Sequence, residues 1–175
     1  IESVRNSVGK GLRQLYRDTF VLQGFARSSN EAIAFVDGLL RRYLRVSVEV
    51  AQQYADAREA ECIEKADMFE GLKFLGSPVL LEEDDEYEDE KQEFAFERPP
   101  FEIIVKNLEH KVADDVIDIL RLGFEGLLQN ILVAAFQIQK RFTGRGDLTY
   151  EAFQNVLNIW KTAPGRKDTL IHRLC

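Results

Sequence analysis

The stretch that most restricts the fold is a long run without proline from Asp114 to Phe142, DDVIDILRLGFEGLLQNILVAAFQIQKRF. Its apolar residues recur at helical spacing, and Asp114 is placed to cap the start. The predicted helix, residues 114–141, spans about 42 Å. Short neighbouring helices cannot cover that length on both faces, so a second long helix is required to bury it.

A second run of the same kind lies earlier in the chain, from Asn30 to Arg58, NEAIAFVDGLLRRYLRVSVEVAQQYADAR. Its apolar positions also follow helical spacing. Ser28, followed three residues later by Glu31, predicts a capping box at its start. The chain therefore supplies the second long helix itself, over residues 30–57.

One offset relates the two runs. Adding 84 to each apolar position of the first gives an apolar position of the second, and the same shift relates residues before and after the helices. Agreement across three elements predicts a structural duplication. The matched pairs are Phe20–Ile104, Val21–Val105, Ile33–Ile117, Val36–Leu120, Leu40–Phe124, Tyr43–Leu127, Leu44–Leu128, Val48–Leu132, Ala51–Ala135, Tyr54–Ile138, Phe69–Phe153 and Leu72–Val156.

The charge is concentrated in one segment. Residues 1–77 hold 11 Lys/Arg and 11 Asp/Glu, residues 78–97 hold one Lys and 10 Asp/Glu, and residues 98–175 hold 11 Lys/Arg and 9 Asp/Glu. Self-repulsion in the middle segment disfavours compaction. We expect an acidic linker at 78–97, either solvated or in contact with a basic partner, between half one (residues 1–77) and half two (residues 98–175).

Each half is predicted to contain a short, a long and a short helix, so the fold class is all-α. The short helices are expected near Val4–Leu22 and Glu64–Leu75 in half one, and near Phe101–Glu109 and Thr149–Trp160 in half two. Gly123, Gly126 and Gly38 lie inside the long helices, where glycine costs about 1 kcal/mol against alanine. They predict close approach by another backbone.

Short, long and short helices around a central helix of this length resemble the histone fold. In half one, ADMFEGL (Ala66–Leu72) is similar to the third-helix pattern of that family, with Asp67, Met68, Gly71 and Leu72 at its fixed positions, and Arg58 stands where the family often has a loop arginine. In half two, Glu151 and Asn155 take the Asp and small positions. The threonine frequent before the third helix is replaced by Glu64 and Leu148.

Two such folds in tandem resemble a histone-fold doublet, which implies a handshake pseudo-dimer with the long helices crossing. The linker can reach about 65 Å, so the simplest pairing is intramolecular; pairing with another chain stays open. The residues expected to form the internal pairing are Leu40, Leu44, Val48, Phe124, Leu128 and Leu132.

The sequence gives no support to an enzyme. It has no phosphate-binding glycine pattern and no recognisable Ser/His/Asp grouping. Cys62 and Cys175 form no CxxC, and His110 and His172 lie far apart without a Cys/His cluster, so we expect no metal and no cofactor. No apolar run of about 18 residues lacks a charge, so no membrane span is expected.

DNA wrapping requires many Lys/Arg to neutralise phosphates, and neither half is strongly basic. We therefore expect a non-enzymatic assembly module of a nuclear transcription or chromatin complex, bound to its other protein subunits. The alternative is a DNA-contacting doublet of a kinetochore or an architectural chromatin factor. A third hypothesis is a helical adaptor protein that is unrelated to histones. The candidate DNA contacts are Arg41, Arg42, Arg45, Lys140, Arg141 and Arg145.

Overall fold

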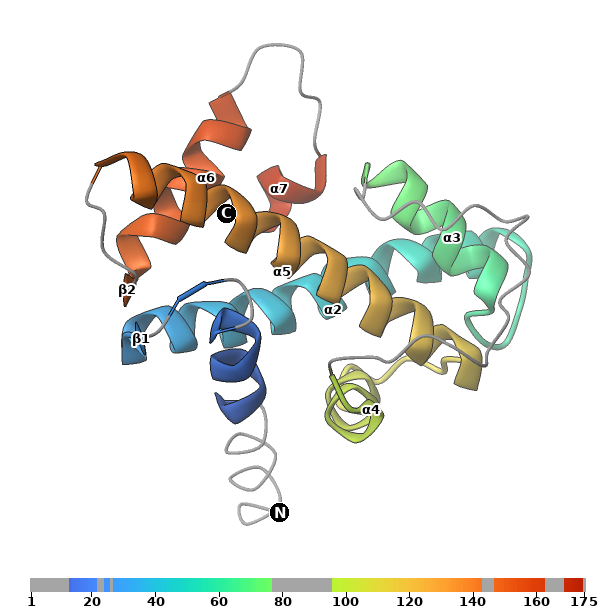
Figure 1. Cartoon of the computed structure of the whole chain (residues 1–175). Coiled ribbons are helices and arrows are strands. Elements are labelled where there is room, and N and C mark those ends of the chain that lie inside the picture. The colour runs from blue at the N-terminus through green and yellow to red at the C-terminus, as the bar shows by residue number, and fades with distance from the viewer. Residues whose placement is uncertain are drawn as a thin grey trace, which may run out of the picture. The chain divides into compact units, whose positions relative to one another are not determined.

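The computed structural model describes residues 13–21, 24–25, 27–76, 96–142, 147–162 and 169–174. Residues 13–21 are helical. Figure 1 shows the two long helices, α2 in blue to cyan and α5 in yellow to orange. The elements are β1 Arg27–Ser28, α2 Asn30–Ala57, α3 Lys65–Phe74, α4 Arg98–Lys106, α5 Asp114–Phe142, β2 Asp147–Leu148, α6 Tyr150–Thr162 and α7 Thr169–Leu174.

The described part of the chain is mostly helical, and both predicted long helices are confirmed. The first helix of half two begins at Arg98 rather than Phe101, because Pro99 and Pro100 fit a first turn, where the missing N–H has no partner to lose. Residues 4–12 and 22 of half one's predicted first helix and residues 78–95 of the acidic linker lie outside the described residues. The sequence did not predict α7, β1 or β2.

Two predicted caps are wrong. Ser28 belongs to β1, and the residue that caps α2 is Ser29, whose hydroxyl accepts a hydrogen bond from the Ala32 N–H at 3.1 Å. Asp114 is the first residue of α5 rather than a cap, and its carboxylate lies 3.2 Å from the Arg98 guanidinium. The cap of α2 thus lies one residue after the predicted serine, a common error at helix ends.

The 84-residue offset describes burial along the long helices well. The matched positions are buried in both, except Tyr54 and Ile138, which are half-buried in both. In the short helices before them Phe20 and Ile104 are both buried, but Val21 is exposed where Val105 is buried. The apolar periodicity of α2 and α5 therefore predicts correctly that equivalent positions of the two helices form the buried face.

The offset becomes 85 after the long helices, because α5 is one residue longer than α2. The buried residues of α3 and α6 match at this shift and not at 84, so the predicted matches of Phe69 and Leu72 are wrong. The position of Asp67 in half two is then held by Ala152, not by Glu151. The buried sets are Asp67, Met68, Gly71 and Leu72 in α3, and Ala152, Phe153, Val156 and Leu157 in α6.

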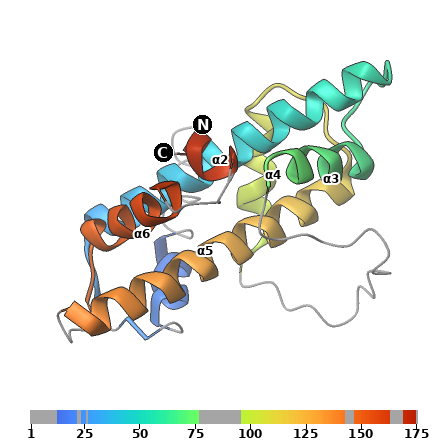
Figure 2. The same ribbon diagram turned by 90° about the horizontal axis from the view of Figure 1, so that it is seen from above.

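The chain divides into two compact units, and each takes one part of each long helix. Unit 1 contains α2 up to Leu40, α5 from Leu128, β1, β2 and α6. Unit 2 contains α2 from Arg41, α5 up to Leu127, α3, α4 and α7. In Figure 2, α6 lies beside the N-terminal part of α2 and α3 beside its C-terminal part. The compact units are therefore not the two sequence halves.

Part of α5, Asp114–Gln139, is long and apolar enough to cross a membrane by length and composition alone. Half of its most apolar window is buried inside the structure. The sequence criterion allowed no charge in such a run, whereas this helix carries Asp118 and Arg121, which form an ion pair at 3.1 Å. A core helix that is apolar on more than one face meets the same test.

An ion pair in unit 2 joins the end of α2 to α3. Arg58 donates from Nε to Asp67 Oδ1 at 2.8 Å and from Nη2 to Oδ2 at 2.5 Å, and the Glu64 N–H donates to Asp67 at 2.9 Å. Asp67 is buried. The hydrogen bonds from Arg58 lower the pKa of Asp67, and burial raises it by a smaller amount. The pKa of Asp67 therefore lies below its usual value.

This lowered pKa predicts an acid-sensitive contribution to folding. The stabilisation is complete above the unfolded-state pKa of Asp67, near 3.8, and is lost as the pH falls through the lower folded-state value. We expect Asp67→Asn to reduce the free energy of unfolding by about 1–2 kcal/mol at pH 7, with a smaller reduction at pH 3. Urea unfolding at both pH values measures the difference.

The matched control is Glu70→Gln, at an exposed position of the same helix, which should change the free energy of unfolding by less than about 0.5 kcal/mol. A reduction by Asp67→Asn that is the same at both pH values would contradict the role given to the carboxylate.

Candidate assembly core and charged surfaces

All six residues predicted to form the internal pairing are fully buried. The structure distributes them between the two units: Leu40, Leu128 and Leu132 lie in unit 1, and Leu44, Val48 and Phe124 lie in unit 2. Each unit therefore contains predicted pairing residues from both long helices. Their common pairing role stays a prediction.

An aromatic cluster forms the centre of unit 2. The ring of Tyr43 on α2 lies 5.8 Å from that of Phe124 on α5, measured between centroids. Phe96, two residues before α4, and Phe101, near the start of α4, lie 5.9 Å and 6.5 Å from the same Phe124 ring. Such tilted and edge contacts add about 0.5–1.5 kcal/mol each beyond area burial. A residue of half one thus packs against a cluster formed by two residues of half two and by Phe96, near the end of the linker segment.

Gly123 directly precedes Phe124 and accommodates the Tyr43 side chain. A methyl group at Gly123 would lie 3.3 Å from Tyr43 Cζ and would overlap the hydroxyl oxygen. The sequence predicted that this glycine permits close approach of a backbone, and that reason is wrong. The space is taken by the end of the Tyr43 side chain, so a larger residue at position 123 requires that side chain to shift.

Unit 1 has a different aromatic cluster. Phe35 on α2 stacks on Phe153 of α6 at 5.3 Å and meets Tyr150 edge-on at 5.3 Å. Phe20 lies 6.2 Å from the same Phe153 ring. Half one again contacts half two, here through Phe35 and Tyr150, which the sequence pattern did not mark, as well as through Phe20 and Phe153. Helical spacing marks apolar faces but does not reveal which rings meet.

Two loop pairings have reciprocal positions in the halves. In unit 1, β1 pairs in parallel with β2, joining the loop before α2 to the loop after α5. In unit 2, Ile63 bridges to Val112, joining the loop after α2 to the loop before α5. The Ile63 N–H donates to the Lys111 carbonyl at 2.8 Å, and the Ala113 N–H to the Ile63 carbonyl at 2.9 Å. Both pairings satisfy backbone groups that buried loops would otherwise leave unpaired.

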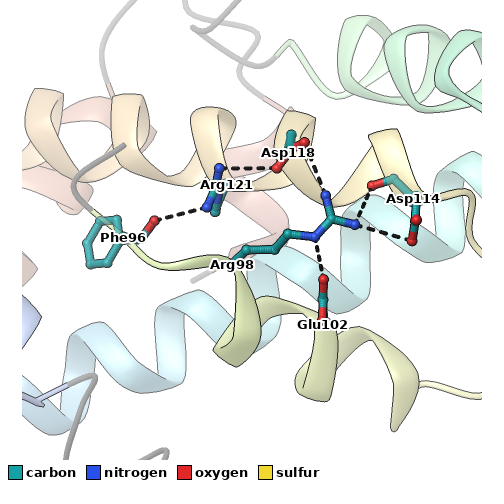
Figure 3. Close-up of polar contacts among 6 residues, drawn as sticks. All are labelled: Phe96, Arg98, Glu102, Asp114, Asp118 and Arg121. Atoms are coloured by element: carbon teal, nitrogen blue, oxygen red, sulfur yellow. Dashed lines mark hydrogen bonds and ion pairs between the residues drawn. The ribbon is translucent and has the colours of Figure 1, made fainter. Parts of the chain in front are cut away.

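Arg98 binds the start of α4 to the first turn of α5, as Figure 3 shows. Its guanidinium lies 3.2 Å from Asp118 and 3.2 Å from Asp114, pairs with Glu102, and donates to the Asp114 carbonyl at 3.0 Å. The hydrogen bond to Glu102 is the main reason why its pKa is raised. Negative groups in a first turn also compensate the helix dipole, so this cluster orients α4 rather than forming an open anion site.

Arg121, one turn beyond Asp118, extends the same cluster (Figure 3). It lies 3.1 Å from Asp118 and donates to the Phe96 carbonyl at 3.4 Å. Through these bonds a buried cation holds the segment that carries Phe96 into the aromatic cluster of unit 2. The polar and aromatic contacts of α4 therefore support each other.

The candidate DNA contacts fall in different places. Arg41 and Arg45 are exposed and Arg42 is half-exposed on the part of α2 that belongs to unit 2. Lys140 and Arg141 lie within the bounds of α5 in unit 1, and Arg145 lies outside the described residues. The structure therefore does not bring the two predicted clusters into one unit.

The two units differ strongly in charge. By sequence, unit 1 holds 10 Lys/Arg and 6 Asp/Glu, whereas unit 2 holds 13 Lys/Arg and 24 Asp/Glu, the acidic linker included. The two sequence halves, by contrast, are nearly neutral. These counts follow the sequence ranges of the units; among the described residues of unit 1, Arg27 is exposed on β1.

No family model and no curated protein matches this sequence. Among solved structures the chain is similar to a histone from Methanopyrus kandleri, with a TM-score of 0.61 and 16% sequence identity. The match covers 87% of this chain and 95% of that histone chain. At this identity the likeness concerns the fold alone, and it supports a histone-fold relationship for the chain.

Proposed function

We propose that this chain is a non-enzymatic histone-fold doublet whose two halves pair with each other. The observation that carries the proposal is the reciprocal loop pairing, β1 with β2 and Ile63 with Val112, because each pairing joins one half to the other. A match that covers 87% of the chain also extends over more than one half. In this proposal α2 and α5 are the crossing helices of an intramolecular handshake.

The proposed role is that of an assembly module in a nuclear transcription or chromatin complex. In the proposed pairing the apolar faces of α2 and α5 are used internally, and partner subunits would bind the outer surface. The acidic linker, with 10 Asp/Glu against one Lys, is suited to a basic partner. This charge disfavours a packaging role, because phosphate neutralisation dominates DNA affinity.

A second function, direct contact with duplex DNA, is favoured by the charge of unit 1. That unit has four more Lys/Arg than Asp/Glu. Arg27 is exposed on β1 of this unit, and Lys140 and Arg145 fall in the same unit by sequence range. In this version the doublet belongs to a kinetochore or an architectural chromatin factor.

The pairing is tested with Leu128→Asp in the full chain. A carboxylate placed at a fully buried position without a partner should reduce the free energy of unfolding by about 3–5 kcal/mol. Urea unfolding and light scattering at several concentrations measure stability and mass. Leu44→Asp should act alike in unit 2.

The matched control for Leu128→Asp is Val133→Asp, on the same helix with the side chain 44% exposed. It should change the free energy of unfolding by less than about 0.5 kcal/mol. A compact, single-chain Leu128→Asp protein with unchanged unfolding would rule out the handshake.

The DNA alternative is tested by the salt dependence of duplex binding. If unit 1 contacts phosphates, Arg27→Ala/Lys140→Ala/Arg145→Ala should lower the slope of log affinity against log salt by roughly 0.9 for each lost contact. The control, Arg41→Ala/Arg42→Ala/Arg45→Ala, removes equal charge from unit 2 and should leave the slope nearly unchanged. Equal losses from both variants would reject unit 1 as the site, and no binding at low salt would leave assembly as the function.

A further inference from the structure

We propose that Tyr43 and Gly123 form a one-sided lock that makes half one and half two selective for each other and unsuited to pairing with a second copy of themselves. The inference rests on the proposed pairing of the halves. Tyr43 is fully buried, and its ring end occupies the space that a side chain at position 123 would need. The lock thus consists of a ring on half one and a notch on half two.

The duplication shows that the lock has no counterpart at the equivalent positions. At the offset of 84, Tyr43 matches Leu127 and Gly123 matches Leu39, and all three side chains are fully buried. Half one therefore has the tyrosine, but it has Leu39 at the position that matches Gly123. Half two has the glycine, but it has Leu127 at the position that matches Tyr43.

Self-pairing would place the wrong residues together. In a pair of two half-one copies, each Tyr43 would meet Leu39 of the other copy, and such overpacking forces side chains and backbone to shift. In a pair of two half-two copies, Leu127 would meet Gly123 and leave a gap at two places. The mixed pair is the combination that accommodates the tyrosine.

The aromatic contacts of unit 1 are one-sided in the same way, and they form an independent observation. Phe35 stacks on Phe153 at 5.3 Å, whereas the equivalent positions hold Ile119 and, at the offset of 85, Met68. Phe25 meets Phe136 edge-on at 5.7 Å. Each of these contacts needs one residue from each half.

The kind of partner that half one fits is therefore half two, and discrimination comes from misfit in the alternatives as well as from fit in the mixed pair. Such discrimination would prevent two chains from exchanging halves, a known route to unwanted dimers of duplicated folds. Tyr43 acts as a specificity-determining residue, and Gly123 is the position whose missing side chain leaves room for it.

The test begins with the full chain carrying a protease site in the 78–97 linker. The folded protein is cleaved, unfolded, refolded, and examined by native mass spectrometry, where the two halves differ in mass. We expect mixed pairs to exceed the random ratio of one to two to one by about tenfold or more, as misfit at two sites per self-pair would produce. Random pairing would overturn the lock while leaving the handshake intact; separate, unpaired halves would overturn both.

The assignment to Tyr43 is tested with Tyr43→Leu in the same cleaved chain. This variant removes the overpacking from half-one self-pairs, so these pairs should increase several-fold. The two halves are equimolar, so the half-two fragments left over should appear as self-pairs or single halves in the matching amount. The matched control is Tyr54→Leu, a half-buried position on the same helix, which should leave all ratios as in the wild type. Unchanged ratios for Tyr43→Leu would overturn its role.

A second measurement needs no refolding of separate halves. In the intact chain Gly123→Ala should lower the melting temperature, and Tyr43→Phe in the same protein should recover part of the loss, because the overlapping hydroxyl is gone and the nearest ring carbon lies 3.3 Å away. Alanine also has a higher helix propensity than glycine, so the deciding comparison is the effect of Gly123→Ala in the wild-type and in the Tyr43→Phe background. The same effect in both backgrounds would show that the side chain at position 123 does not meet the tyrosine hydroxyl.

Discussion

The structure depends on covering two long apolar helices. Each has a buried face that runs almost its whole length, from Ala32 to Ala55 in α2 and from Val116 to Ala135 in α5. A short helix can cover only part of such a face, since a helix advances about 1.5 Å per residue. Each compact unit solves this by combining part of α2 with part of α5. Neither half of the sequence could form either core alone.

This interleaving explains what the sequence could and could not predict. Helical periodicity predicted α2 and α5 well, because Ile33 and Ile117, or Leu44 and Leu128, are buried for the same reason at the same place in a repeat. It failed where one residue changes the register. The extra residue of α5 moved the match of Asp67 from Glu151 to Ala152, and no periodic pattern marks a shift at a helix end.

Charge shows the same limitation in another form. Counted along the sequence, the two halves are close to neutral and the acidity lies in the linker. Counted over the sequence ranges of the compact units, unit 1 holds more Lys/Arg than Asp/Glu, because α5 contributes its basic C-terminal end there and its acidic first turn, with Asp114 and Asp115, to unit 2. An electrostatic surface belongs to residues close in space. Counts over the two halves of the sequence therefore do not give the net charge of either compact unit.

The two halves have also specialised in their polar contacts. Half one closes its long helix with Arg58 on Asp67, and half two has Ala152 at the position of that carboxylate. Half two fastens its first helix with Arg98, whereas the equivalent residue of half one, Gln14, donates to Asp18 at 2.9 Å. A repeat that had to pair with its own copy would need contacts that fit twice. A repeat that always pairs with one different partner does not have this requirement, so a contact can be present once, with one residue from each half. The contact of the buried Tyr43 ring with Gly123 is an example.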